Sequence, residues 1–377
     1  MARIQTALIV GGGIGGLATA IALRQRGIEA TVVERAPAFA EVGAGISLWP
    51  NATRVLRDLG ALGLLLERAG RINALHIPDA SGRVLLRSPI PQPDAPALCA
   101  YRPDLIEALY AQLPEGTVRF GTTVASVHTD ESGARLTFED GSTAEADVVI
   151  GADGIHSAVR TFVTGRDEPP VYRGYPVWRG IAPLPESFVP GAISESWENG
   201  QRFGLLDVGG DRAYWYATAN RPASEPSRDP KADVLRLFAD WHDPIPEVVQ
   251  ATPEGAVMRS GTYDRPPLRG WSRGRAVLMG DAAHPTTPNL GQGGCMALED
   301  APALARCLAD AASLPEAFRQ FERARYRRTS RVTRESLWTG RLGQASGRLG
   351  SLRNALMART PGAFYSRRQQ WLFEYRA

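Results

Sequence analysis

Residues 4–16 read IQTALIVGGGIGG, and this stretch decides the fold. The apolar run 4–10 predicts a short buried strand, and the glycines at 11–16 predict a turn. The spacing of apolar residues over 17–25 predicts a helix that stops at Gly27, and residues 30–33 predict a second buried strand. A strand, a helix and a strand in this order indicate a βαβ unit, in which a right-handed crossover joins two parallel strands.

The glycines of this turn have the spacing G-x-G-x-x-G. Gly11 permits the tight turn, Gly13 lets the backbone approach a pyrophosphate, and Gly16 allows the helix to pack closely on the strand. The helix N-terminus adds unpaired N–H groups and a partial positive charge. Glu34 ends the second strand eighteen residues after Gly16, where its carboxylate can accept hydrogen bonds from ribose hydroxyls. The pattern predicts a dinucleotide site and leaves FAD and NAD open.

The rest of the chain alternates between two textures. Apolar spacing predicts helices over 51–68 and 102–113, and strands over 146–150 and 275–279, the latter leading into a glycine-rich loop and a helix from about Gly294. Residues 71–98 and the aromatic-rich stretch 171–219 predict strands, the second an antiparallel sheet, with helices at 231–241 and 246–251 beside it. We therefore expect a nucleotide-binding domain in three pieces (1–70, 100–165 and 270–340), a substrate domain inserted as 71–99 and 166–269, and a C-terminal helical segment at 341–377.

Composition excludes several classes of protein. The net charge is only +3, from 43 basic and 40 acidic side chains, and no basic stripe suggests a nucleic-acid partner. Three scattered cysteines, Cys99, Cys295 and Cys307, predict neither a disulfide framework nor a metal site, and fit a cytoplasmic protein. The uncharged run 7–23 is too short and too rich in glycine to span a membrane, so no integral membrane segment is expected.

Two later segments identify the cofactor. Residues 151–154 read GADG, and residues 280–294 read GDAAHPTTPNLGQGG. With the glycine turn, these motifs closely resemble the single-component FAD-dependent aromatic hydroxylases, which are class A flavoprotein monooxygenases. The resemblance extends to about residue 330, and salicylate-type hydroxylases, urate hydroxylases and zeaxanthin epoxidases are the most similar members. It implies an α/β fold with a GR2-type, Rossmann-like FAD-binding domain, an inserted antiparallel substrate sheet and a C-terminal helical segment.

The resemblance also implies roles for individual residues. Arg102 matches an arginine near the FAD diphosphate and ribityl chain, Val124 a backbone contact to adenine, and Asp281 the ligand of the ribityl chain. The segment from Pro288 to Gly294 should pass beside the isoalloxazine ring, where its N–H groups can stabilise negative charge. The full set of predicted cofactor-binding residues is Gly11, Gly13, Ile14, Gly15, Gly16, Glu34, Arg35, Arg102, Val124, Asp153, Asp281, Pro288, Gly291, Gly293 and Gly294.

The chemistry implied by the family belongs to the flavin. NADH or NADPH reduces FAD, dioxygen adds to give a C4a-hydroperoxide, and one oxygen passes to an electron-rich aromatic or heteroaromatic substrate. No amino-acid nucleophile is needed, and we expect no catalytic side chain and no metal. The predicted substrate-lining residues are Trp178, Arg202, Phe203, Tyr214 and Tyr216, and the stretch 43–51, with Gly43 and Trp49, should run past the flavin. Sheet packing is the alternative role for the five lining residues.

Several alternatives stay open at this point. Epoxidation of an alkene, and reduction without oxygen transfer, both fit the fold, and a flavin-binding sensor is the non-catalytic alternative. His284 and His156 have no paired acid evident in the sequence, so we favour polar packing near the cofactor over a proton shuttle. The basic run 323–331 is interpreted as a solvated helix face. Substrate identity, the choice between NADH and NADPH, and the oligomeric state are left undetermined.

Overall fold

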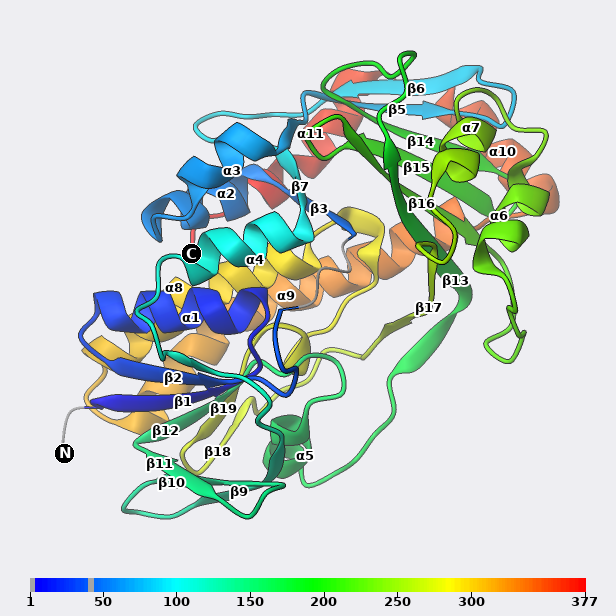
Figure 1. The fold of residues 1–377 in the computed structure, drawn as a ribbon. Coiled ribbons are helices and arrows are strands. Elements are labelled where there is room, and N and C mark those ends of the chain that lie inside the picture. The colour runs from blue at the N-terminus through cyan, green and yellow to red at the C-terminus, as the bar shows by residue number, and fades with distance from the viewer. Residues whose placement is uncertain (1–3, 40–43) are drawn as a thin grey trace.

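A computed structural model describes residues 4–39 and 44–377. A six-stranded sheet forms the centre of the first half of the fold, with strand order β18-β19-β12-β1-β2-β8 (Figure 1). Strand β1 pairs in parallel with β2, as the βαβ unit predicts, and also with β12; only β18 runs antiparallel to its neighbour. The strands are β1 (Thr6–Val10), β2 (Glu29–Val33), β8 (Val118–Arg119), β12 (Val148–Gly151), β18 (Ser272–Arg273) and β19 (Ala276–Leu278).

Helix α1 (Ile14–Gln25) joins β1 to β2 and is buried along most of its length. It packs between the sheet and α8 (Gly293–Asp310). Gly11 has φ +105°, and a side chain there would lie 2.5 Å from the carbonyl oxygen of Ala152. Only glycine fits this position, because the turn crosses directly over the neighbouring strand.

A seven-stranded, mainly antiparallel sheet forms the second half, in the order β17-β13-β16-β15-β14-β5-β6 (Figure 1). Gly204 lies beneath the ring of Tyr216, where a Cβ would be 2.2 Å from the ring carbons. The strands are long enough to form one continuous surface, unlike the short strands expected from the sequence. They are β5 (Ala74–Pro78), β6 (Val84–Pro89), β13 (Val171–Pro183), β14 (Ala192–Glu198), β15 (Gln201–Asp207), β16 (Arg212–Ala219) and β17 (Met258–Asp264).

Alternation along these strands sorts their side chains between two faces. One face packs Trp178, Phe203 and Trp215 against Phe238 of α6 (Pro230–Phe238) and against α7 (Ile245–Ala251). The other face, which carries Tyr214 and Tyr216, turns toward the half of the molecule built on the six-stranded sheet (Figure 1). Two small sheets complete the strands: β3 (Gly45–Leu48), β7 (Leu98–Tyr101) and β4 (Gly70–Arg71), and β11 (Thr143–Ala146), β10 (Ala134–Phe138) and β9 (Val124–Thr129).

The prediction of a single helix over 51–68 is wrong in one respect. The region forms two helices, because Gly60 has φ +81° and follows the end of the first helix. The C-terminal region is helical, as expected, and the last two helices lie against the seven-stranded sheet (Figure 1). Within the described residues, no helix is both long and apolar enough to cross a bilayer. The remaining helices are α2 (Pro50–Asp58), α3 (Leu62–Arg68), α4 (Arg102–Tyr110), α5 (Ala158–Thr164), α9 (Leu314–Gly343), α10 (Gly347–Met357) and α11 (Gly362–Phe373), with 3₁₀ turns at Gly280–Ala282 and Pro288–Leu290.

Candidate active site

A groove of about 490 Å³ opens at the carboxyl ends of β1, β2 and β12. In doubly wound sheets this edge is where ligands bind. Three predicted cofactor residues lie outside it: Gly16 packs beneath the turn against Gly11, and Pro288 and Gly291 line a neighbouring cavity. The predicted residues that do line the groove are Gly11, Gly13, Ile14, Gly15, Glu34, Arg35, Arg102, Val124, Asp153, Asp281, Gly293 and Gly294.

The turn before α1 presents backbone rather than side chains to the groove. Gly13 caps α1 without any side-chain hydrogen bond, and a Cβ placed on it would meet nothing within 4 Å. The backbone at this position therefore borders open space, where the first N–H groups of α1 lack intrahelical acceptors and the helix dipole has its positive end. This end of the groove is suited to a diphosphate.

Glu34 follows β2 and lies beside the glycine turn. Its Oε2 accepts from the Gly12 N–H at 2.7 Å, and its Oε1 accepts from the Ala36 N–H at 2.9 Å. These two bonds fix the carboxylate at the groove wall and leave further lone pairs for hydroxyl donors.

Asp281 follows β19 and lines both the groove and the neighbouring cavity. Its side chain is open to the groove, but protein encloses the site on the other sides, and this burial raises the pKa of the carboxyl. His284 and Arg102 pull the same pKa down, which places Arg102 within electrostatic reach of Asp281. A carboxylate and a guanidinium thus face the groove together.

Asp153 and His156 both line the groove near α5. Asp153 accepts hydrogen bonds from the Ser157 hydroxyl and from the Val159 N–H, so it also caps the start of that helix. Burial raises the pKa of Asp153, against these hydrogen bonds. His156 is exposed and has no acidic partner among the described residues with which it makes a hydrogen bond or ion pair.

Beneath the Asp281 turn lies a buried charge network that the sequence did not reveal. Asp300 of α8 accepts from the Gly280 N–H at 2.8 Å, pairs with His284 Nε2 at 2.7 Å, and accepts from Arg325 Nε at 2.6 Å. Burial alone would raise the pKa of Asp300, but His284 and Arg325 outweigh it and hold that pKa at about 2. His284 therefore has a paired acid that the sequence did not reveal, and the same acid also bonds the backbone of the turn at Gly280.

The network continues through Glu299, which pairs with Arg325 at 2.6 Å and with Arg328 at 3.0 Å. Both arginines belong to the basic run 323–331, and both are buried. The prediction of a solvated helix face is thus wrong for Arg325 and Arg328, which turn inward at helical spacing, although Arg323, Arg327 and Arg331 are exposed as expected.

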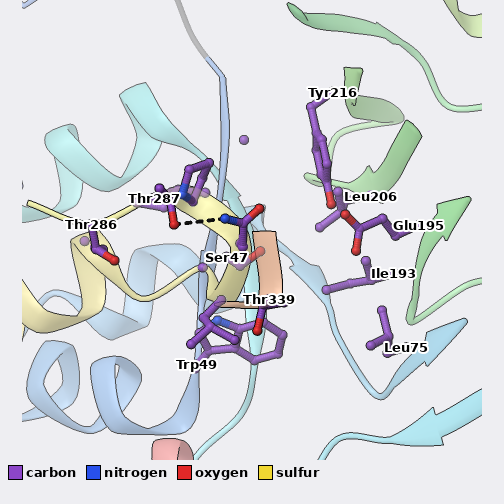
Figure 2. A pocket seen from close by; sticks show the side chains of 18 of the residues that line it. Ser47, Trp49, Leu75, Ile193, Glu195, Leu206, Tyr216, Thr286, Thr287 and Thr339 are labelled. Carbon is purple, nitrogen blue, oxygen red and sulfur yellow. Dashed lines mark hydrogen bonds between the residues drawn. The ribbon is translucent and has the colours of Figure 1, made fainter. Parts of the chain in front are cut away.

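A second cavity, of about 310 Å³, lies between the groove and the seven-stranded sheet, and Figure 2 shows it from close by. Arg202, Tyr214 and Tyr216 line it. Trp178 and Phe203 do not: both are 1% exposed and pack in the core on the opposite face of the sheet. The prediction of a lining role is corrected for these two residues, because alternation turns them away from the cavity.

Several lining residues were missed by the sequence analysis. Glu195 of β14 points into the cavity, as does Leu206 of β15 (Figure 2). Helix α11 contributes Leu372 and Phe373, and Phe373 stacks on Trp49 with ring centroids 4.9 Å apart. Period-two alternation on β14 and β15 could have indicated the strand residues, whereas nothing in the sequence places α11 at this wall.

Two smaller expectations concern the same region. Trp49 lines the second cavity, while Gly43, expected to pass the flavin, lies outside the described residues. Cys295 is buried at the start of α8, and burial raises the pKa of its thiol to about 12. A small buried thiol, rather than a nucleophile, is therefore the role that the structure supports for Cys295.

Comparison with known proteins agrees with this site. Residues 4–336 match the family described as "FAD binding domain". The chain is 39% identical to the aurachin C monooxygenase/isomerase of Stigmatella aurantiaca over 344 residues (90% of each protein), and 39% identical to the 3-amino-4-hydroxybenzoate 2-monooxygenase of Streptomyces cremeus over 341 residues (87% of this chain, 85% of that protein).

A solved structure also matches closely. HpxO of Klebsiella pneumoniae, complexed with FAD and uric acid, has a TM-score of 0.89 at 29% identity, over 95% of this chain and 94% of that one. The match covers both the nucleotide-binding half and the seven-stranded sheet. The chain therefore belongs to the FAD binding domain family, and it is an FAD-dependent monooxygenase of the aromatic hydroxylase type.

Proposed function

We propose that this enzyme uses NADH or NADPH and dioxygen to hydroxylate a small aromatic or heteroaromatic molecule bound in the second cavity, beside FAD held in the groove. One observation carries the proposal: the groove and the cavity share a wall formed by Ile46, Asp281, Gly293 and Gly294. A cofactor that fills the groove to this wall would place its reactive end at the mouth of the cavity.

The groove fits FAD in its chemistry. The glycine turn before α1 would hold the diphosphate, and Glu34 would accept from the adenosine ribose. Asp281 and Arg102 would hold the ribityl chain and the adjoining phosphate at the other end. The start of α8 at Gly293 would direct its N–H groups toward the flavin ring, where a partial positive charge favours the reduced form.

FAD would supply the redox chemistry, because a reduced flavin can activate dioxygen and side chains cannot. The protein's part is to hold the substrate ring and exclude water. The aromatic and aliphatic lining does both: Trp49 and Phe373 cover one side of the cavity, and Tyr214 and Tyr216 form the floor on β16. Arg202 stands at the polar end of that floor.

The relatives support the proposed substrate class. One is a monooxygenase of an aminohydroxybenzoate, which is an aromatic ring, and the HpxO structure contains uric acid. The test uses purified, FAD-loaded protein with NADH or NADPH and a panel of phenols and hydroxylated heterocycles. We expect substrate-stimulated consumption of the nicotinamide, and a product that gains one oxygen atom from ¹⁸O-labelled dioxygen.

Tyr216→Phe tests the cavity, because it removes one hydroxyl from the floor while keeping the ring. It should raise KM for the substrate about tenfold if that hydroxyl contacts the ligand, as the loss of one hydrogen bond predicts. Tyr263→Phe is the control, since Tyr263 is 38% exposed on β17.

In the labelling experiment, a product without labelled oxygen would refute hydroxylation and favour a reductase, whereas an epoxide product would favour epoxidation of an alkene.

A further inference from the structure

Arg202 is already bonded to three protein side chains. Its side chain is 3% exposed, and its Nε donates to Gln344 Oε1 at 2.8 Å. One terminal nitrogen donates to Asn289 Oδ1 at 2.7 Å, and the other pairs with Glu195 Oε1 at 3.3 Å. Each nitrogen of the guanidinium therefore already has a protein acceptor, and the partly buried carboxylate of Glu195 balances its charge.

Glu195 brings that negative charge into the cavity itself. It lies on β14, and Figure 2 shows its carboxylate beside the hydroxyl of Tyr216. Burial, followed by the field of Glu195, raises the pKa of Tyr216, whose hydroxyl hydrogen-bonds this carboxylate. Burial and Glu195 likewise raise the pKa of Tyr365 of α11, which also lines the cavity, to about 12. Both phenols therefore stay neutral beside Glu195.

The charges that line the cavity cancel. Among the described lining residues they are two arginines, Arg179 and Arg202, and two carboxylates, Glu195 and Asp281. Arg179 donates to Ser260 Oγ at 2.7 Å on β17, on the side of the sheet away from β14. Arg179 contacts Ser260 and Tyr214 rather than a carboxylate, but it lies on β13, with β16 and β15 between it and Glu195. A ligand carboxylate at the Glu195 end of the cavity would lose its water and meet Glu195 as a like charge.

Next to Glu195 the lining becomes apolar. Leu75, Ile193 and Leu206 come from the adjacent strands β5, β14 and β15 and gather on one side of the cavity, with Trp49 across from them (Figure 2). Leu372 of α11 extends this surface. The cavity therefore has a hydrogen-bonding end and an aliphatic end.

We infer that the substrate is an uncharged hydroxylated aromatic or heteroaromatic ring with an apolar substituent, and that Glu195 determines the preference for a neutral ring over an aromatic carboxylate. The inference rests on the proposed function, which makes this cavity the substrate site. The ring's O–H or N–H faces Glu195 and Tyr216, and the substituent lies against Leu75, Ile193 and Leu206.

The first experiment needs only the FAD-loaded wild-type protein. Calorimetric dissociation constants are measured for phenols that differ at the para position: 4-methylphenol, 4-propylphenol, 4-pentylphenol and 4-hydroxybenzoate. We expect affinity to rise about three- to fourfold per added methylene, as burial of apolar surface predicts. We expect 4-hydroxybenzoate to bind at least about tenfold more weakly than 4-methylphenol, because its charge is buried without a partner. Tighter binding of the carboxylate, or affinity independent of chain length, would overturn the inference.

The second experiment tests Glu195 itself. Glu195→Gln keeps the shape and removes the charge that neutralises Arg202, so the affinity for 4-hydroxybenzoate should improve at least about tenfold relative to 4-methylphenol. Glu198→Gln is the matched control, because it makes the same change three residues along β14, on the opposite face. An equal affinity ratio in the two variants would refute the role of Glu195. Glu195→Asp retains the charge and should retain the wild-type preference.

Binding and turnover are measured separately, so the two proposals can fail separately. A protein that binds the alkylphenols tightly but never oxygenates them would support the substrate class and contradict the proposed function. A protein that oxygenates only aromatic carboxylates would support the proposed function and refute this inference.

Discussion

Replacing Asp300 with asparagine removes the charge at the centre of the buried network beneath the Asp281 turn. The carboxylate accepts from the Gly280 N–H and from Arg325 and pairs with His284, and it is wholly buried. Asparagine has the same shape but only one acceptor oxygen, so at least one of these three partners loses its bond. The turn that carries Asp281 should loosen.

The magnitude follows from the pKa of Asp300, which lies at about 2 instead of the ordinary 3.8 because His284 and Arg325 outweigh burial. That difference corresponds to about 2.5 kcal/mol of favourable interaction with the charged form. The variant also leaves one buried donor without an acceptor, while Arg325 keeps its ion pair with Glu299. Together these effects lower the free energy of unfolding by about 3 kcal/mol, at the low end of the range for breaking a buried ion pair. For 377 residues this lowers Tm by ~4 °C.

The pH dependence has a definite sign. A folded-state pKa below the unfolded value gives stability that is present above about pH 4 and is lost as pH falls toward 2. The stability difference between wild type and Asp300→Asn should therefore be constant near neutrality and shrink across that window. Urea unfolding of the apoprotein at a series of pH values measures it.

The control is Asp310→Asn, on the same helix α8. Asp310 is paired only loosely with Arg26, at 3.8 Å, and its side chain is 59% exposed, so the loss should stay below about 0.5 kcal/mol. FAD fluorescence titration adds a functional measurement, in which the loosened turn of Asp300→Asn weakens FAD binding about tenfold. If the two variants unfold at the same urea concentration, the reasoning about the network is wrong.

Three further predictions concern the groove and its surroundings. Asp281→Ala should weaken FAD retention while leaving the urea midpoint of the apoprotein unchanged, because the side chain is open to the groove; full retention of flavin would contradict the contact. Gly11→Ala should destabilise the apoprotein by about 2 kcal/mol or more, because φ is +105° and the new Cβ would lie 2.5 Å from Ala152 O. Gly13→Ala has space for its Cβ, so it should leave the stability of the apoprotein nearly unchanged and weaken FAD binding. Cys295 should resist iodoacetamide at pH 8 in the native state, because burial raises the pKa of its thiol to about 12, and should react in urea; native labelling would argue for an exposed thiolate.

The nucleotide-binding half could be predicted from the sequence because local rules determine it. The turn at 11–16 needs glycine for steric reasons, and Glu34 ends a strand whose register to β1 follows from the βαβ unit. Most of the predicted cofactor residues line one groove for the same reason. The role of each in binding FAD stays a prediction until binding is measured.

The lining of the second cavity was harder to predict because it depends on strand register. Tyr214 and Tyr216 share a face, as alternation predicts, but Arg202 and Phe203 are consecutive and cannot both face the cavity. Trp178 pairs with Ala217 across β13 and β16, and so turns to the same side as Trp215. That pairing is a tertiary fact that the composition of the strands does not contain.

The prediction that the basic run 323–331 forms a solvated helix face was partly wrong for a related reason. Arginines at 325 and 328 look like the surface charges around them until Glu299 and Asp300 are brought beside them by the packing of α8 on α9. Two consecutive acids in a largely apolar helix could have suggested a buried partner. The identity of that partner required the fold.

The buried network also connects the two cavities physically. Arg328, which pairs with Glu299, donates to the carbonyl oxygen of Leu372 at 2.9 Å, and Arg54 donates to that of Tyr375 at 2.9 Å. These bonds hold the end of α11, whose Leu372 and Phe373 line the second cavity. The same charges therefore support the turn that carries Asp281 and the wall against which an apolar substituent would lie. Glu299 is shared between Arg325 and Arg328, so one carboxylate takes part both in the contacts beneath the Asp281 turn and in those that hold the end of α11.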